Sequence, residues 1–188
     1  MAKFESLFES ILQGLHEART VGSGSSSVKL MVMFDVNKLG IEPEAIETEM
    51  QTVVTNMLAD VKESYFEHME KTRKVWDSNS KFSNKDSVFN KLVKIEKGYI
   101  SNPAGEEANA EGQQYIVELK LNSGVTDDKM SAEHPESGGR TYKWSVAPIY
   151  DLIVGSKFTS VFDPNENELI KKHKELATKY FFVAEEMN

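Results

Sequence analysis

Hydrophobic residues near the N-terminus recur with the period of an α-helix. Over residues 3–19 they are separated by three or four positions, which places them on one face of a helix. The stripe consists of Phe4, Leu7, Phe8, Ile11, Leu12 and Leu15. Because an isolated helix of about 16 residues is marginally stable in water, we expect this stripe to dock on another surface.

A flexible stretch, VGSGSSS, follows this helix at residues 21–27. Gly and Ser have little tendency to order and are typical of linkers. We therefore divide the chain into an N-terminal helical arm (1–20), a tether (21–27) and a single α+β domain (28–188). The pattern leaves two alternatives open, because the arm could dock on a neighbouring molecule or fold back on its own domain.

Four segments of the domain have strand patterns. Residues 28–36, VKLMVMFDV, are almost continuously apolar and predict a buried strand. Residues 91–100 and 113–122 alternate between apolar and polar positions, which predicts an antiparallel hairpin with a long tip. Residues 141–148 alternate as well, with Pro148 ending the ladder.

A long helical pattern runs from about Pro43 to Trp76. Ile46, Met50 and Val53 open a stripe that continues to Tyr65 at steps of three and four residues. At 1.5 Å per residue such a helix would be roughly 45 Å long. This length is large for a small domain, so we expect part of the helix to project or to pack against a neighbour.

The C-terminal region has an ambiguous part and a helical part. Residues 149–162 are apolar without a clear period, and we interpret them as a strand or turn with a break at Gly155. Asp163 and Pro164 then provide a cap and a first helical residue for a helix through about Glu185. The order of elements predicts an α+β fold with a mostly antiparallel sheet of about four strands. One long helix and the C-terminal helix would pack on that sheet.

Composition excludes several classes of site. The 188 residues contain no cysteine, which excludes disulfides, thiolate metal sites and a thiol nucleophile, and favours a cytoplasmic or virion setting. Glu5 and Glu9 interrupt the apolar residues at the N-terminus, so we expect no secretory signal. Apolar runs are too short to cross a membrane, so we expect a soluble protein without membrane contact.

Charge is unevenly distributed along the sequence, whose net charge is −8. Residues 41–70 carry eight acidic residues against one lysine, whereas residues 71–100 carry eight basic residues against three acidic ones. Solvated faces are the simpler interpretation. The alternative is a basic patch that complements an acidic face on another molecule and orients association.

The basic segment also allows a different function. Lys71, Arg73, Lys74, Lys81, Lys85, Lys91 and Lys94 could form a patch for an anionic partner. Trp76, Phe82, Phe89 and Tyr99 lie among them, and interleaved basic and aromatic residues can bind single-stranded nucleic acid. The acidic overall charge and the scarcity of arginine make nucleic acid the less favoured partner.

No catalytic or metal motif is complete. The four histidines, His16, His68, His134 and His173, are not spaced as metal ligands. A hydrolase or transferase would need scattered carboxylates such as Asp35 and Asp151 to converge in a pocket.

We therefore expect no cofactor, no metal and no catalytic activity. The arm, the long helix and the opposed charges favour a structural or assembly protein that forms a homo-oligomer or joins a larger complex. Cysteine-free, acidic α+β subunits of this size are typical of virion and tail-assembly components. The runner-up is a binding module for an anionic ligand or single-stranded nucleic acid through the basic segment 71–100.

Overall fold

The structure is a computed structural model of the chain. It describes residues 27–72, 85–101, 113–127, 142–155 and 168–187. The predicted arm and residues 21–26 of the tether lie outside the described residues, so the arm stays a prediction. The elements are β1 (Ser27–Asp35), the 3₁₀ turn η1 (Pro43–Ala45), α2 (Ile46–Thr72), α3 (Lys85–Leu92), β2 (Val93–Ser101), β3 (Gln114–Asn122), β4 (Thr126–Asp127), β5 (Tyr142–Lys143), α5 (Ala147–Val154), α7 (Glu168–Tyr180) and β6 (Phe182–Glu186).

The main sheet has four antiparallel strands in the order β2-β3-β1-β6. Strands β2 and β3 pair from Val93↔Leu121 to Ser101↔Gln114, which confirms the predicted hairpin. Strand β1 lies in the interior of the sheet, between β3 and β6. The fold is therefore α+β with four main strands, as the sequence pattern predicts.

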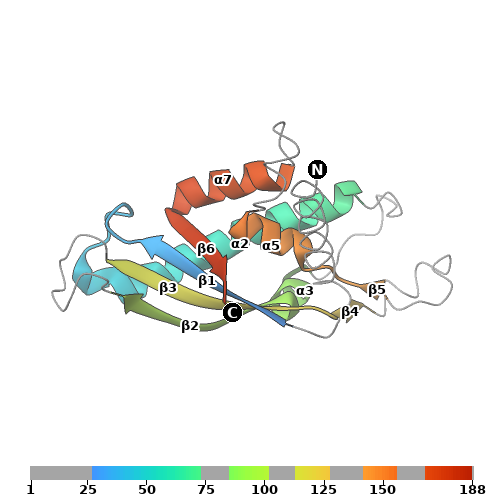
Figure 1. Cartoon of the computed structure of the whole chain (residues 1–188), viewed down its shortest axis with the longest axis horizontal. Helices are drawn as coiled ribbons and strands as arrows, with labels where there is room; N and C mark the ends of the chain where they lie inside the picture. The colour runs from blue at the N-terminus through green and yellow to red at the C-terminus, as the bar shows by residue number, and fades with distance from the viewer. Residues whose placement is uncertain (1–26, 73–84, 102–112, 128–141, 156–167, 188) are drawn as a thin grey trace, which may run out of the picture.

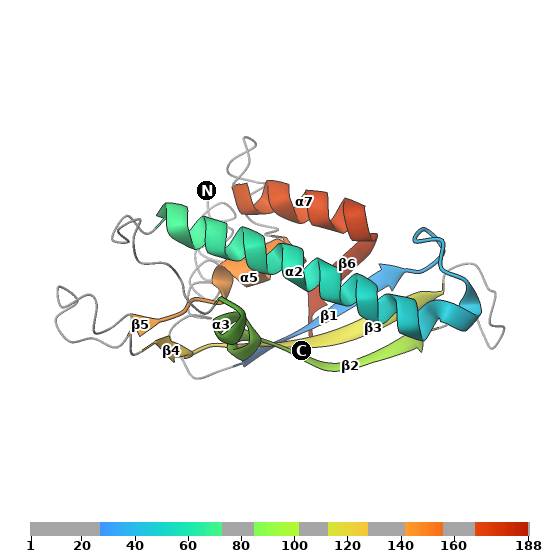
Figure 2. The ribbon, with the colours of Figure 1, turned by 180° about the vertical axis from the view of Figure 1, so that it is seen from behind.

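One face of this sheet forms the hydrophobic core. Alternate residues of β1, from Val28 to Phe34, are buried and pair with the buried residues Leu121, Leu119 and Val117 of β3. Figures 1 and 2 show α2, α5 and α7 together on one side of the sheet, where their apolar side chains join the same cluster. The other face has no helix of the described ranges packed on it.

Helix α2 confirms the long helical pattern with 27 residues. Its predicted stripe is buried along its length at Ile46, Met50, Met57, Val61 and Tyr65. The phenol of Tyr65 donates a hydrogen bond to the carbonyl oxygen of Ser145 at 2.9 Å, which ties the helix to the segment before α5.

Residues 147–154 form a helix, so the interpretation of 149–162 as a strand or turn is wrong for its described part. Pro148 lies in the first turn of α5, where its missing N–H costs nothing. Ile149, Leu152 and Ile153 are all buried, at helical spacing. The surrounding residues are apolar too, which conceals this period in the sequence.

The break expected at Gly155 is confirmed. This residue ends α5 with a positive φ of 75°. A Cβ atom there would lie 2.7 Å from the ring of His173, so both the backbone angle and the space favour glycine. The same ring contacts the Leu152 carbonyl oxygen through Nδ1 at 3.1 Å, which seats α7 against the end of α5.

The predicted C-terminal helix is too long at its end. Helix α7 stops at Tyr180, and Phe181 has a left-handed φ of 49° that turns the chain. Residues 182–186 then pair with β1 as strand β6. The hydrogen bonds that these residues form with the free edge of β1 stabilise a strand more than continuation of the helix would. The helical pattern of the sequence does not reveal this edge.

The strand predicted at 141–148 is much shorter in the structure. Of its described residues, 142–148, only Tyr142 and Lys143 pair, with β4, in a separate two-stranded ladder. Trp144 and Val146 are both buried in the core. The indole ring of Trp144 packs against the rings of Tyr65 and Phe66 on α2. The alternation in this segment therefore comes from the burial of Trp144 and Val146 and not from pairing in a long strand. Strand β6 supplies the fourth main strand.

Candidate functional site

The sheet face opposite the core presents both apolar and charged side chains. We call it the open face and define it by Lys94, Glu96, Lys97, Tyr99, Ile116, Glu118, Lys120, Lys29, Met31, Met33, Val183 and Glu185. Strand register places most of these residues opposite the core positions, because alternate side chains point to opposite faces. All four strands therefore contribute to one continuous surface.

An apolar row crosses the open face from one edge to the other. Tyr99 pairs with Ile116, Ile116 with Met33, and Met33 with Val183, so the four side chains are cross-strand neighbours. Ile116 is buried between its neighbours, whereas Tyr99 is 38% exposed and Val183 is 62% exposed. The row is thus most accessible at the two edges of the sheet.

An ion pair borders this row. Glu118 is buried, and its Oε1 lies 2.9 Å from the Lys97 Nζ and 3.5 Å from the Tyr99 hydroxyl. The hydrogen bond to Glu118 raises the pKa of Lys97, so the amine stays charged. Lys97 also lies 5.3 Å from the Tyr99 ring centre, a cation–π distance.

A row of three lysines crosses the sheet next to this pair. Lys94 pairs with Lys120, and Lys120 pairs with Lys29. The β2 ladder shifts register between Ile95 and Lys97, and this bulge leaves Glu96 as the extra residue.

Glu96 neutralises only part of this lysine row. Its Oε2 lies 3.0 Å from the Lys29 Nζ. The Lys29 hydrogen bond lowers the pKa of the Glu96 carboxyl, with further lowering from Lys120 and Lys97. Within the described ranges, Lys94 and Lys120 have no ion-pair partner of their own.

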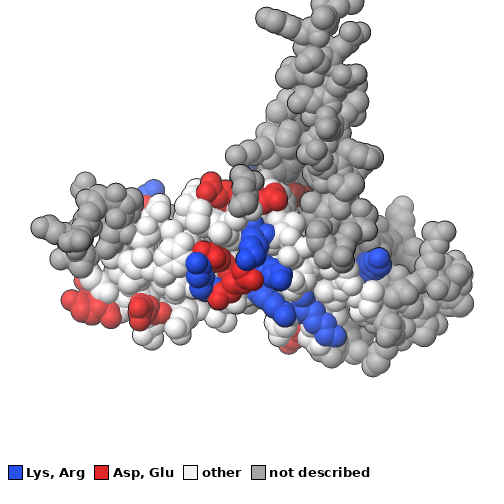
Figure 3. Space-filling model, turned by 60° about the horizontal axis from the view of Figure 1, so that its bottom comes forward, with Lys and Arg blue, Asp and Glu red and all other residues white. Residues whose placement is uncertain are grey.

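Figure 3 shows the molecule from below, with basic and acidic side chains gathered in the middle of the surface and an uncharged region beside them. Ile95 and Ile100 at the edge of the sheet are 52% and 37% exposed, but they pair with Leu119 and Tyr115 and therefore lie on the side of the core. The apolar residues of the open face adjoin one another in the row from Tyr99 to Val183. Adjoining apolar residues of this kind are typical of contact surfaces.

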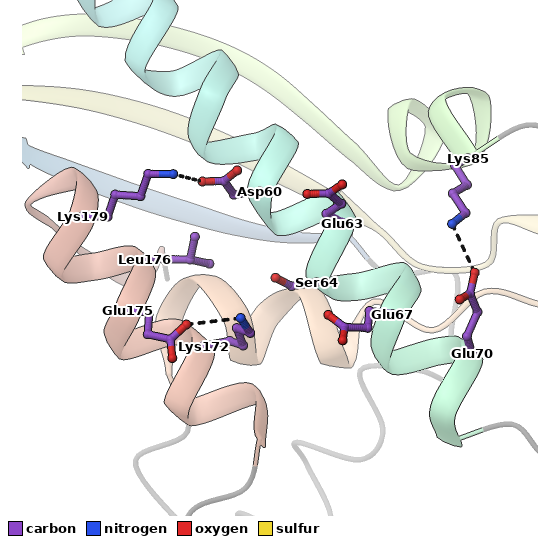
Figure 4. Close-up of a pocket in the computed structure, with 10 residues that line it drawn as sticks. All are labelled: Asp60, Glu63, Ser64, Glu67, Glu70, Lys85, Lys172, Glu175, Leu176 and Lys179. Atoms are coloured by element: carbon purple, nitrogen blue, oxygen red, sulfur yellow. Dashed lines mark hydrogen bonds and ion pairs between the residues drawn. The ribbon is translucent and has the colours of Figure 1, made fainter.

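A second feature is a groove of about 480 Å³ between α2 and α7, with Lys85 of α3 at one end (Figure 4). Its lining is highly charged: Asp60, Glu63, Ser64, Glu67, Glu70, Lys85, Lys172, Glu175, Leu176 and Lys179. Several of these charges are paired within the groove. Lys85 lies 3.1 Å from Glu70, and Lys172 lies 3.2 Å from Glu175.

Asp60 is the central link of this groove. Its Oδ2 accepts hydrogen bonds from Lys179 at 2.7 Å and from the Tyr180 hydroxyl at 2.6 Å. Burial by itself raises the pKa of Asp60. The hydrogen bonds from Lys179 and Tyr180 together lower it by a larger amount, so the pKa of Asp60 is below its usual value. The pairs join α2 to α7 and therefore have a structural role.

The predicted basic patch is divided between paired and unpaired residues. Lys71 lies 2.8 Å from Glu168 and 3.0 Å from Glu67, and Lys85 pairs with Glu70 in the groove. Lys91 and Lys94 are exposed at the end of α3 and on β2. Arg73, Lys74 and Lys81 lie outside the described residues, so the patch as a whole stays a prediction.

The two carboxylates suggested for catalysis lie on different sides of the sheet. Asp35 ends β1 on the side of the open face, and its Oδ1 accepts a hydrogen bond from the Lys38 backbone N–H at 3.0 Å. Asp151 belongs to α5 in the helical layer, where burial raises its pKa to about 6. The fold does not bring them together.

The two histidines in the described ranges, His68 and His173, are packed against the fold. His68 on α2 is half-buried, and burial is the largest cause that lowers its pKa. His173 packs against Phe182 with ring centres 6.1 Å apart. Within the described ranges no group of three histidine, aspartate or glutamate side chains could hold a metal ion, and no helix could span a membrane.

Sequence reasoning did not identify the open face. The run VKLMVMFDV reads as a fully buried strand, yet Met31 and Met33 are only half-buried. Lys29 and Asp35 are a signal that could have identified this face, because they occupy the same alternate positions. No family model, curated protein or solved structure shows significant similarity to this chain.

Proposed function

We propose that this protein is a non-enzymatic structural or assembly subunit that binds protein partners, copies of itself included, through its N-terminal arm and charged surfaces. The observation that carries the proposal is the apolar row across the open face, with its exposed ends at Tyr99 and Val183. A larger complex in the cytoplasm or in a virion would be a suitable setting.

The surroundings of the row support a contact with protein. Apolar residues in the centre of a protein interface exclude water, while polar and charged residues around them set its orientation. The Lys97–Glu118 pair and the three lysines are arranged in this way beside the row. The arm adds a second apolar surface, because its six-residue stripe would be exposed on an undocked helix.

The test is the light-scattering mass of the full chain at low and high salt, compared with the double variant Leu7→Asp, Ile11→Asp. We expect the parent chain to form an oligomer and the variant to have the mass of one chain, because two carboxylates would be forced into an apolar contact. The matched control, Ser6→Asp, Ser10→Asp, adds the same charge on the opposite helical face and should keep the oligomer.

Two outcomes would contradict the proposal. An oligomer unchanged in the double variant would show that the arm is not the contact. A single-chain mass for the parent under all conditions would favour the second candidate, an anionic-ligand module. The observation in favour of that candidate is that Lys94, which is exposed, and Lys120, which is half-buried, have no ion-pair partner among the described residues.

A further inference from the structure

We propose that the open face receives the N-terminal arm of a second copy of this chain. The inference rests on the proposed function and identifies the surface on which the arm docks. Three observations support it: the apolar match between arm and face, the charges beside both, and the point at which the arm joins the sheet.

The first observation is the apolar match. The arm has a continuous stripe from Phe4 to Leu15, which spans about 18 Å as a helix. The row on the open face crosses four strands about 4.8 Å apart, and Met31 extends it along β1. A helix laid on this face would cover apolar side chains that no described helix covers.

The second observation is charge complementarity. In a helix, Glu5 and Glu9 lie one turn apart and border the apolar stripe on one side. On the open face, Lys94 and Lys120 lie beyond the Lys97–Glu118 pair, two rows from the apolar row, and have no ion-pair partners among the described residues. Docking would give these two lysines carboxylate partners and fix the direction of the helix.

The third observation is the attachment point. The tether enters β1 at Ser27, and β1 is an inner strand of the sheet. The six tether residues before β1, 21–26, can extend about 20 Å, which is enough for the arm to reach a copy packed beside its own sheet. In a reciprocal exchange each copy supplies one arm and one face, so two identical contacts form around a two-fold axis.

The experiment mixes two full-length variants that are each defective in one half of the contact. The arm variant is Leu7→Asp, Ile11→Asp, and the face variant is Tyr99→Asp, Val183→Asp. We expect each alone to dimerise at least about tenfold more weakly than the parent, and the mixture to form heterodimers through its one intact arm and one intact face. Light scattering and sedimentation of the separate and mixed samples measure this.

A matched control separates the open face from exposed apolar residues in general. Ile95→Asp, Ile100→Asp places two carboxylates at exposed positions of the same edge strand, and we expect it to dimerise like the parent. Circular dichroism checks folding. A second pair keeps the test decisive if the face variant misfolds: Lys94→Glu, Lys120→Glu should weaken the dimer, and mixing it with Glu5→Lys, Glu9→Lys should restore it.

The outcomes distinguish this inference from the proposed function. If the arm variant is monomeric while both face variants remain dimeric, the arm binds elsewhere, so this inference fails and the proposed function stands. If neither mixture forms heterodimers although the parent is dimeric, docking in trans on this face is wrong. If the arm variant dimerises like the parent, the proposed function itself fails.

Discussion

Asp151 is the residue at which burial and charge conflict most clearly. It lies on α5 within the helical layer, and burial alone raises its carboxyl pKa to about 6. Its side chain has no ion-pair partner within the described ranges. A carboxylate that is withdrawn from water without a compensating partner lowers the stability of the folded state whenever it is ionised.

We therefore expect Asp151→Asn to stabilise the protein above pH 6. The folded pKa lies above the unfolded value of 3.8, so the parent loses stability as pH rises through this window, while the neutral amide does not titrate. The gain should be about 1–2 kcal/mol at pH 7.5, after a discount for partial exposure, and close to zero below pH 4. Urea unfolding across pH 4–8 measures it.

A matched control for this prediction is Glu185→Gln, which removes an exposed carboxylate from β6. Its effect on the free energy of unfolding should be within about 0.5 kcal/mol at either pH. An Asp151→Asn variant whose stability parallels that of the parent at every pH would show that burial does not perturb this carboxyl.

At the scale of elements, α2 and α7 are joined by the Asp60 cluster. Asp60, in the middle of α2, accepts hydrogen bonds from both Lys179 and Tyr180, and Lys71 connects the C-terminal end of α2 to Glu168. These contacts bridge residues that are about a hundred positions apart in the sequence. They orient two helices whose stripes alone specify only which face is buried.

Replacing Asp60 with Asn should weaken this connection in a pH-dependent way. The net pKa of Asp60 is lowered in the folded state, so its contribution is present above the unfolded value and is lost as pH falls through the folded value. We expect a loss of about 1 kcal/mol at pH 7, a modest value because the side chain is one-third exposed, and a smaller loss at pH 2.5, where the carboxyl is less ionised. Urea unfolding at the two pH values is the measurement.

A double-mutant cycle with Lys179→Met isolates the pair from general effects on helix packing. A coupling energy near zero at pH 7 would mean that the contact adds nothing to the docking of α7.

At the scale of the whole molecule, the last strand completes the sheet. Strand β6 occupies the free edge of β1, and Phe182 is buried beside Phe34 with ring centres 5.8 Å apart. The Phe182 ring also packs against His173 of α7. One residue close to the C-terminus therefore contacts the central strand and the helical layer together.

Phe182→Ala should accordingly be strongly destabilising. Removal of a buried aromatic ring leaves a cavity, and we expect a loss of about 3–4 kcal/mol in the free energy of unfolding. The neighbouring Phe181→Ala is the control, since that ring is 39% exposed and its loss should cost less than about 1 kcal/mol. Thermal or urea unfolding compares them, and equal losses would contradict the packing described for β6.

The sequence by itself determined the elements whose hydrophobic period is clear. The stripe from Ile46 to Tyr65 predicts α2, and the alternation in 113–122 predicts β3 and its hairpin with β2. These patterns are local, because a helix or strand needs only its own side chains to define a buried face. They were sufficient for the α+β class and for three of the four main strands, whereas the fourth is β6 in place of the strand predicted at 141–148.

Only the tertiary structure decided the elements and surfaces that depend on distant partners. Residues 149–154 are apolar except for Asp151 and show no clear period, so packing against α2 and α7 settles them as a helix. Residues 182–186 become a strand because β1 has a free edge. The open face exists because four segments align Tyr99, Ile116, Met33 and Val183 in one row, and strand register of this kind joins residues that no local pattern relates.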